Sequence, residues 1–421
     1  MQPKPPPGPI ESAEPGRAAA EKAARQSYGR LLAILSARTR DIAASEDALA
    51  DAFARALERW PAEGVPDRPE AWLLSVARHR TLDAWRHSKV EDEATQTLLL
   101  LSDEIGDVDR AGTQAVPDER LRLLFVCAHP AIDAAARAPL MLQTVLGLDA
   151  ARIAGAFLSA PATLGQRLVR AKARIRAARI PFEYPRASEL PQRLLDVLDG
   201  IYAAYGTGWD EVDGADATRR GLTAEAIELG SILCALMPDE PEPLGLLALM
   251  LFCESRAVAR RDAEGRYVAL EVQDVTRWNP ALRARAEEAL ALAHRIGRLG
   301  PFQIEAAIQS AHCARRLGTP VPPRALVELY DGLIALRPGI GAEVGRACAI
   351  AEAEGAAAGL RALDRLDAPE FASYQPLWAA RAHLLARNGE RDAAREAYAR
   401  AAGLSTSPAV RAWLATESER A

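Results

Sequence analysis

Residues 149–180 read Asp149-Ala-Ala-Arg-Ile-Ala-Gly-Ala-Phe157, then Leu158-Ser-Ala-Pro161, and then the basic run 162–180. Asp149 is well placed as an N-cap, and Ile153 and Phe157 lie one turn apart on a face that we expect to be buried. Pro161 ends this pattern, but a proline fits the first turn of a second helix, which Ser159 can cap. The stretch predicts two helices joined by a tight turn.

The second helix carries two stripes. The apolar stripe, at spacings of 4, 3 and 4, consists of Leu164, Leu168, Ala171 and Ile175. The polar stripe beside it consists of Thr163, Gln166, Arg167, Arg170 and Arg174. With Lys172, Arg176 and Arg179, the run 162–180 has six basic residues and no acid.

Such a helix suits the major groove of DNA. Thr163, Gln166 and Arg167 could reach base edges, while Arg170, Lys172 and Arg174 would contact phosphates. A solvated basic face on a helical hairpin produces the same pattern, so this segment alone leaves both interpretations open.

The composition favours an all-α protein. Hydrophobic residues make up 49% of the 421 residues and aromatic residues only 5%, and the surplus is Ala and Leu, which favour helices. The 52 Lys and Arg residues are outnumbered by 57 Asp and Glu residues, which gives a net charge of −5. Any DNA-binding surface must therefore be local.

The sequence predicts a cytoplasmic, non-enzymatic protein without a cofactor. The five cysteines are scattered and never form Cys-x-x-Cys, so we expect reduced thiols in the core. No run approaches the ~18 apolar residues of a membrane span, which predicts no membrane partner. The six histidines form neither a His-Glu-x-x-His pattern nor a Cys/His metal spacing.

Changes in composition along the chain predict five segments. They are a disordered Pro-rich tail (1–24), a compact helical domain (25–89), an acidic linker (90–117), the helix-turn-helix domain (118–182) and a succession of Ala/Leu-rich helices (190–418). Within the last segment, residues 266–272 could form a short strand or a loop.

The compact helical domain combines an acidic helix with a basic one. Apolar residues of the first helix that share one face are Leu49, Phe53, Leu57 and Trp60. Asp47, Asp51 and Arg55 fall mostly on the other face and could meet a partner. In the next helix we expect Trp72 in the core and the arginines 78, 80 and 86 available, a combination that suits single-stranded DNA.

Two stretches of this domain, 48–57 and 71–83, resemble region 2 of the bacterial extracytoplasmic-function sigma factors. The helix-turn-helix resembles region 4 of the same family. The segments 121–133 and 166–172 are similar to the subgroup of these sigma factors that carries a C-terminal extension like tetratricopeptide repeats. The resemblance covers nearly the whole chain after the tail.

The resemblance implies a promoter-specificity factor for transcription initiation, with core RNA polymerase and promoter DNA as its partners. The stretch similar to the polymerase-binding segment contains Asp47, Asp51, Phe53 and Arg55. The stretch where the family engages the −10 element contains Arg78, Arg80, Trp85 and Arg86. The helix that reads the −35 element corresponds here to Thr163, Gln166, Arg167 and Arg170, with Lys172 and Arg174 at phosphates.

One tetratricopeptide repeat is recognisable near the C-terminus. Its small and aromatic positions are Trp378, Ala382, Gly389, Ala394, Tyr398 and Ala401. We expect an irregular helical solenoid that regulates or completes activity and offers a surface for a protein or peptide partner. Two alternatives stay open: a free-standing helix-turn-helix regulator with a tetratricopeptide-like sensor domain, and a scaffold whose basic helix is incidental.

Overall fold

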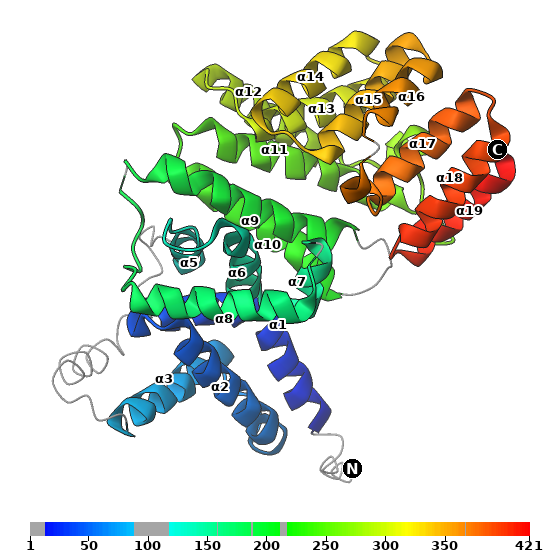
Figure 1. Ribbon diagram of the computed structural model, residues 1–421. Helices are drawn as coiled ribbons and strands as arrows, with labels where there is room; N and C mark the ends of the chain where they lie inside the picture. The colour runs from blue at the N-terminus through cyan, green and yellow to red at the C-terminus, as the bar shows by residue number, and fades with distance from the viewer. Residues whose placement is uncertain (1–12, 88–117, 158, 187, 211–216, 367) are drawn as a thin grey trace, which may run out of the picture. The chain divides into compact units, whose positions relative to one another are not determined.

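A computed structural model describes residues 13–87, 118–157, 159–186, 188–210, 217–366 and 368–421 (Figure 1). The described residues form helices and connecting turns, with no strand beyond a single bridge between Arg261 and Tyr267. The all-α prediction is therefore confirmed. The acidic linker predicted at 90–117 lies outside the described residues.

The chain divides into two compact units. The first spans residues 1–207 with 220–222, and the second spans 208–219 with 223–421. The finer domain boundaries drawn from the sequence stay predictions.

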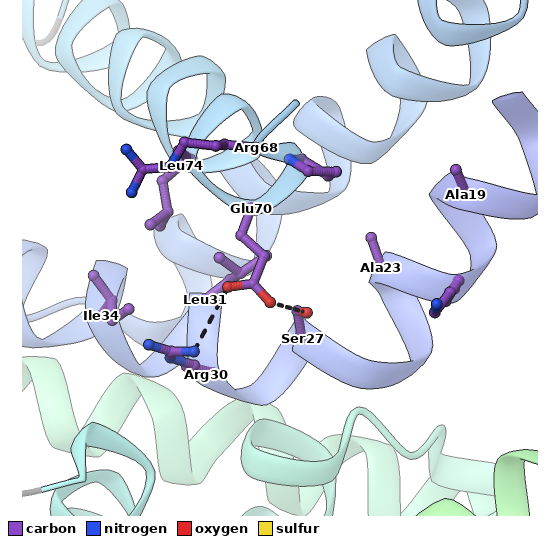
Figure 2. A pocket seen from close by; sticks show the side chains of 12 residues that line it. Ala19, Ala23, Ser27, Arg30, Leu31, Ile34, Arg68, Glu70 and Leu74 are labelled. Atoms are coloured by element: carbon purple, nitrogen blue, oxygen red, sulfur yellow. Dashed lines mark hydrogen bonds and ion pairs between the residues drawn. The ribbon is translucent and has the colours of Figure 1, made fainter. Parts of the chain in front are cut away.

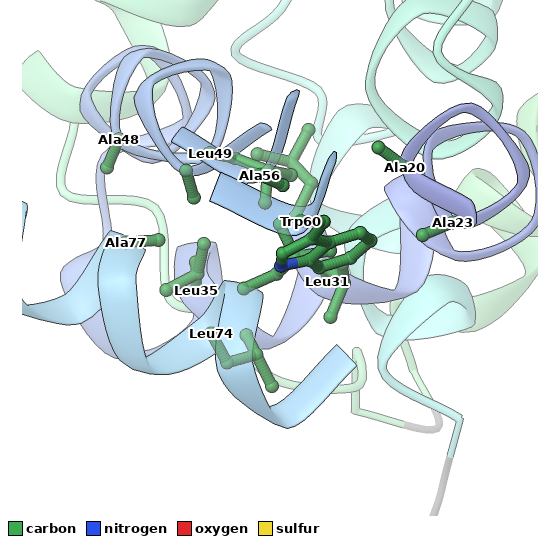
Figure 3. Close-up of a cluster of buried hydrophobic side chains, with 13 residues drawn as sticks. Ala20, Ala23, Leu31, Leu35, Ala48, Leu49, Ala56, Trp60, Leu74 and Ala77 are labelled. Atoms are coloured by element: carbon green, nitrogen blue, oxygen red, sulfur yellow. The ribbon is translucent and has the colours of Figure 1, made fainter. Parts of the chain in front are cut away.

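The first unit begins with three helices, α1 (Ala13–Thr39), α2 (Ile42–Glu63) and α3 (Pro69–His87). Their buried side chains converge on Trp60 (Figure 3). The ring of Trp60 meets the ring of Trp72 edge-on at 5.5 Å. The expectation of a disordered tail to residue 24 is wrong for residues 13–24, because they form the start of α1 and bury Ala20 and Ala23. Residues 1–12 lie outside the described part.

The buried face of α2 differs from the predicted one. Leu57 is 45% exposed, whereas the small residues Ala52 and Ala56 are fully buried beside Leu49. The neighbouring helices approach α2 closely, and only small side chains fit between them. The alanines therefore occupy the core positions, and the larger Leu57 side chain lies outside.

Further along the first unit, the described residues form α5 (Glu119–Cys127), α6 (Ala134–Leu146), α7 (Ala150–Ala156) and α8 (Pro161–Ala177). Both α5 and α6 pack against α1. At the crossing of α1 and α6, a Cβ atom on Gly29 would collide with the carbonyl oxygen of Val145. Helix α1 is therefore shared by the two groups of helices.

Helix α9 (Leu190–Asp210) runs on from this group. Arg137 of α6 donates to Asp196 of α9 at 2.8 Å, and a Cβ atom on Gly200 would collide with the sulfur of Met141. Helix α9, which follows α8 in the chain, is thus packed onto α6.

The second unit is a succession of helices, each packed on a neighbour. They are α10 (Ala217–Leu236), α11 (Pro241–Ser255), α12 (Pro280–Ile296), α13 (Pro301–Arg316), α14 (Pro323–Leu336), α15 (Ile340–Glu354), α16 (Ala356–Asp364), α17 (Gln375–Arg387), α18 (Arg391–Leu404) and α19 (Pro408–Arg420). Several begin with proline at the first helical position, where the missing N–H costs little.

Short 3-10 turns fill the connections: η2 (Ala257–Arg260), η3 (Leu270–Val272) and η4 (Val275–Arg277) lie between α11 and α12, and η5 (Pro369–Phe371) precedes α17. Of the two expectations for residues 266–272, the loop is correct.

The helix pair α17–α18 matches the repeat-like spacing in the sequence. Ala382, Ala394 and Ala401 are completely buried, and Tyr398 is nearly so. Gly389 turns the chain between the two helices with a φ of +84°, a conformation that glycine adopts without strain.

Candidate nucleic-acid interface

Helix α8 is built as the sequence predicts, with one difference at its start. Its apolar stripe of Leu164, Leu168, Ala171 and Ile175 is buried against α6 and α7. Asp149 caps α7 by accepting a hydrogen bond from the backbone N–H of Arg152 at 2.9 Å. The N-cap of α8, however, is Ala160, which has no side-chain hydrogen bond, so the expected cap at Ser159 is wrong.

The polar stripe beside the apolar one is exposed. It presents Thr163, Gln166, Arg167, Arg170 and Arg174 to solvent. The structure thus brings five of the six residues predicted to face DNA onto one open surface, with donors and acceptors near the helix start and cations along the later turns. Such a surface can hydrogen-bond to base edges and neutralise phosphates.

Lys172, the sixth residue, lies elsewhere. Its Nζ is 2.5 Å from Oε2 of Glu46 in α2, and only 11% of the lysine side chain and 19% of the glutamate side chain are exposed. Nearby, Arg176 pairs with Asp41 at 3.3 Å. Lys172 therefore joins α8 to α2 in this structure and does not share the open surface.

The Lys172–Glu46 pair sits in a partly dehydrated polar cluster. Burial raises the pKa of Glu46, and its bond to Lys172 only partly opposes that shift. Burial, together with the charge of Glu46, also raises the pKa of Tyr28. Burial raises the pKa of Cys127 to about 12, and its thiol lies 3.6 Å from the hydroxyl of Thr144. Sequence reasoning missed Glu46, because nothing near it in the chain indicates a partner on α8.

The predicted polymerase-binding residues lie on α2. Asp47 and Arg55 are exposed, and Phe53 is half-buried against the core of the three-helix group. Asp51 accepts a hydrogen bond from Nε of Arg80 in α3 at 2.6 Å. The structure therefore joins one residue predicted to contact polymerase to one predicted to contact DNA.

The other predicted −10 residues lie along α3. Arg78 is half-buried, and Trp72 packs against the core as expected. Trp85 and Arg86 belong to the last turns of α3, and their side chains lie outside the described part. Of the three arginines expected to be available, Arg80 is exposed, Arg78 is half-buried, and the side chain of Arg86 is not described.

A cavity of about 540 Å³ lies between α1 and the start of α3 (Figure 2). Lys22, Arg30 and Arg68 contribute positive charge to its lining, and Glu70 projects into it. Ser27 donates to Glu70 at 2.5 Å, and Arg30 pairs with the same carboxylate at 3.7 Å. Glu70 lies in the first turn of α3, where the helix dipole favours a carboxylate. Its bonds to Ser27 and Arg30 hold the start of α3 against α1.

Groupings typical of metal sites are absent from the described residues: no three His, Cys, Asp or Glu side chains are arranged to hold a metal ion. The five cysteines are free thiols. Among the described helices, none is long and apolar enough to cross a bilayer.

Comparison with known families gives two matches along the chain. The profile of sigma-70 region 2 matches residues 24–90, which cover most of α1–α3. The profile of a family of unknown function (DUF6596) matches residues 193–294, which begin within α9. No solved structure matches the chain significantly.

Two curated proteins are similar to this chain. The uncharacterized protein R00370 of Rhizobium meliloti (strain 1021) is 36% identical over 397 residues, which cover 92% of each chain. The probable RNA polymerase sigma factor RfaY of Xanthomonas campestris pv. campestris is 29% identical over 163 residues, or 36% of this chain and 40% of that protein. The chain belongs to the same family as the Rhizobium protein over nearly its full length, and its residues 24–90 match the sigma-70 region 2 domain.

Proposed function

We propose that the protein binds core RNA polymerase and directs it to specific promoters. The observation that carries this proposal is that the region 2 helices α1–α3 and a helix-turn-helix with an open basic face belong to one compact unit. Initiation requires both a polymerase-binding surface and a promoter-reading surface, and this unit supplies a candidate for each. We expect this activity in the cytoplasm, where the bacterial chromosome lies.

Promoter reading is divided between two helices in this proposal. The exposed residues of α8 read the −35 element, with Arg167 near base edges and Arg170 and Arg174 at phosphates. Arg80 and the later turns of α3 engage the −10 element as single-stranded DNA. Asp47 and Arg55, both exposed on α2, contact polymerase.

We assign the protein to the extracytoplasmic-function subgroup with a tetratricopeptide-like extension. Support comes from the helix pair α17–α18, whose buried small residues have the spacing of such a repeat. In this view the helices of the second unit form a solenoid that regulates or completes promoter use.

In vitro transcription with bacterial core polymerase on a library of promoter fragments tests the proposal. We expect transcripts that depend on the full chain. The comparison chain should end at Thr207, where the first unit ends, because ending it before α9 would strip α6 of its packing partner. Binding to duplex DNA without any initiation would instead favour a free-standing regulator.

A further inference from the structure

The connection between α11 and α12 reaches other helices of the second unit, α13 and α19 among them. The two ends of the connection are held together by a hydrogen bond from the N–H of Asn279 to the carbonyl of Ser255 at 2.7 Å. Residues 256–278 form the loop between these two ends. We call residues 261–273 of this connection the strap.

The strap has a defined local structure. Asp262 accepts hydrogen bonds from the backbone N–H of Arg266 at 2.8 Å and from its Nε at 2.7 Å. The N–H of Val268 donates to the carbonyl of Arg260 at 2.8 Å, and Gly265 turns the chain with a φ of +78°. The tip is therefore a tight turn that presents Tyr267.

Tyr267 reaches the last helix of the chain. Its ring meets the ring of Trp413 in α19 edge-on at 5.5 Å, a favoured aromatic geometry. Burial raises the pKa of the Tyr267 hydroxyl, which agrees with a ring taken out of water by this contact.

The rest of the strap passes α13, α15 and α17. Arg316, at the end of α13, donates to the carbonyl of Gln273 at 2.8 Å, and Gln273 itself is almost completely buried. Burial lowers the pKa values of His312 in α13 and His383 in α17, and the carboxylate of Glu271 opposes the shift at both. Glu271 thus lies within electrostatic reach of two histidines from different helices.

The strap therefore follows one face of α13, α15, α17 and α19, in the manner of a bound peptide. We call this the strap face; the residues that meet the strap are His312, Arg316, His383 and Trp413. It offers an aromatic ring at one end, and along its length it offers imidazoles and a guanidinium that can receive an acidic side chain.

We propose that the strap face is a peptide-binding groove and that the strap is its internal occupant. The partner it fits is an extended peptide with an aromatic residue for Trp413 and, four positions later, an acidic residue in the place of Glu271. Such a partner must displace the strap, so the strap lowers the apparent affinity of the groove for the partner peptide. This inference deepens the regulatory role proposed for the second unit. Peptide binding itself does not depend on that role, but its effect on transcription does.

The test uses a fluorescent peptide with the sequence of residues 261–274 and three forms of the full chain. In the unaltered chain the strap competes at an effective concentration of roughly millimolar, so the peptide should not bind measurably below that range. In the double variant Tyr267→Ala, Glu271→Ala the strap is weakened, and fluorescence anisotropy should show binding at least ~10-fold tighter. Adding Trp413→Leu to that variant should abolish the gain.

Equal binding to all three chains, or no binding to any, would overturn the proposal. Hydrogen exchange provides a second measurement that needs no peptide: Trp413→Leu alone should speed exchange of the amides of 267–273, and unchanged protection there would also contradict it. Neither readout contains polymerase or DNA, so failure here leaves the proposed sigma-factor role untouched.

Discussion

Nζ of Lys172 lies 2.5 Å from Oε2 of Glu46, so an ion pair between residues 126 positions apart joins the basic helix α8 to α2. Both side chains are largely removed from water. A pair of this kind adds little net stability relative to apolar residues, but the loss of one partner leaves the other as an uncompensated buried charge.

Replacing Lys172 should therefore destabilise the first unit. We expect Lys172→Met to lower the free energy of unfolding by about 1–3 kcal/mol, because it leaves the Glu46 carboxylate buried without its cation. Urea unfolding measures this. The double variant Lys172→Met, Glu46→Gln should recover most of the loss; no recovery would mean that the lysine contributes through packing alone.

The raised pKa of Glu46 fixes the sign of a pH effect. A carboxyl whose pKa rises on folding binds its proton more tightly in the native state, so its contribution is fully present below its unfolded pKa and is lost as pH rises through the folded value. Relative to Glu46→Gln, the unaltered chain should therefore lose stability as pH rises upward from about 4.5, the ordinary value. Thermal unfolding of both chains across this range measures the difference, and a gain with rising pH would contradict it.

On the open face of α8, Arg167 and Arg170 should differ in what they contribute. Arg167→Ala should weaken promoter binding by about 1–3 kcal/mol and relax sequence preference. Arg170→Ala should weaken binding to all sequences and reduce the dependence of log K on log salt by about one. Titrations of the polymerase complex at several salt concentrations separate these effects. Arg391→Ala, which removes an exposed arginine from α18, is the matched control.

The Asp51–Arg80 pair permits a charge-swap test of the polymerase surface. Asp51→Arg alone should weaken association with core polymerase, measured by pull-down or interferometry. If Asp51 contacts polymerase, the swap Asp51→Arg, Arg80→Asp should not restore association, although it restores the pair. Full restoration would limit Asp51 to a structural role. Asp392→Arg, at a fully exposed position of the second unit, controls for charge reversal.

Gly29 should resist substitution. Gly29→Ala should destabilise the first unit by about 1–3 kcal/mol, because the added Cβ would collide with the backbone of α6. Gly206→Ala in α9, where a Cβ meets nothing, should be neutral or stabilising by up to about 1 kcal/mol. Thermal unfolding of the two variants compares them directly, and similar losses from both would argue against the close crossing.

The features that the sequence predicted correctly depend on near neighbours in the chain. The buried stripe from Leu164 to Ile175 follows from helical periodicity, and the cap at Asp149 needs only the next three residues. The exposure of Arg167 and Arg170 follows from the same periodicity. The all-α fold follows from the Ala- and Leu-rich composition.

The features that it did not predict depend on distant contacts. A proline-rich composition suggested disorder to residue 24, but Gly16 packs directly on the backbone of Trp60 and Pro61, which makes helix from residue 13 favourable. Bulky Leu57 looked like a core residue, yet close helix packing buries Ala56 instead. Lys172 looked like its basic neighbours, and only the position of α2 distinguishes it.

Helix α1 packs against both groups of helices in the first unit, α2 and α3 on one hand and α5 and α6 on the other. A hinge between the groups therefore cannot lie in α1 itself while that helix stays intact. To change the spacing between α3 and α8, either α2 and α3 or α5 and α6 must detach from α1, and the Lys172–Glu46 pair must separate at the same time. Under the proposed function, adjustment to promoters of different spacer length should therefore be a switch between two states and not a graded flexing.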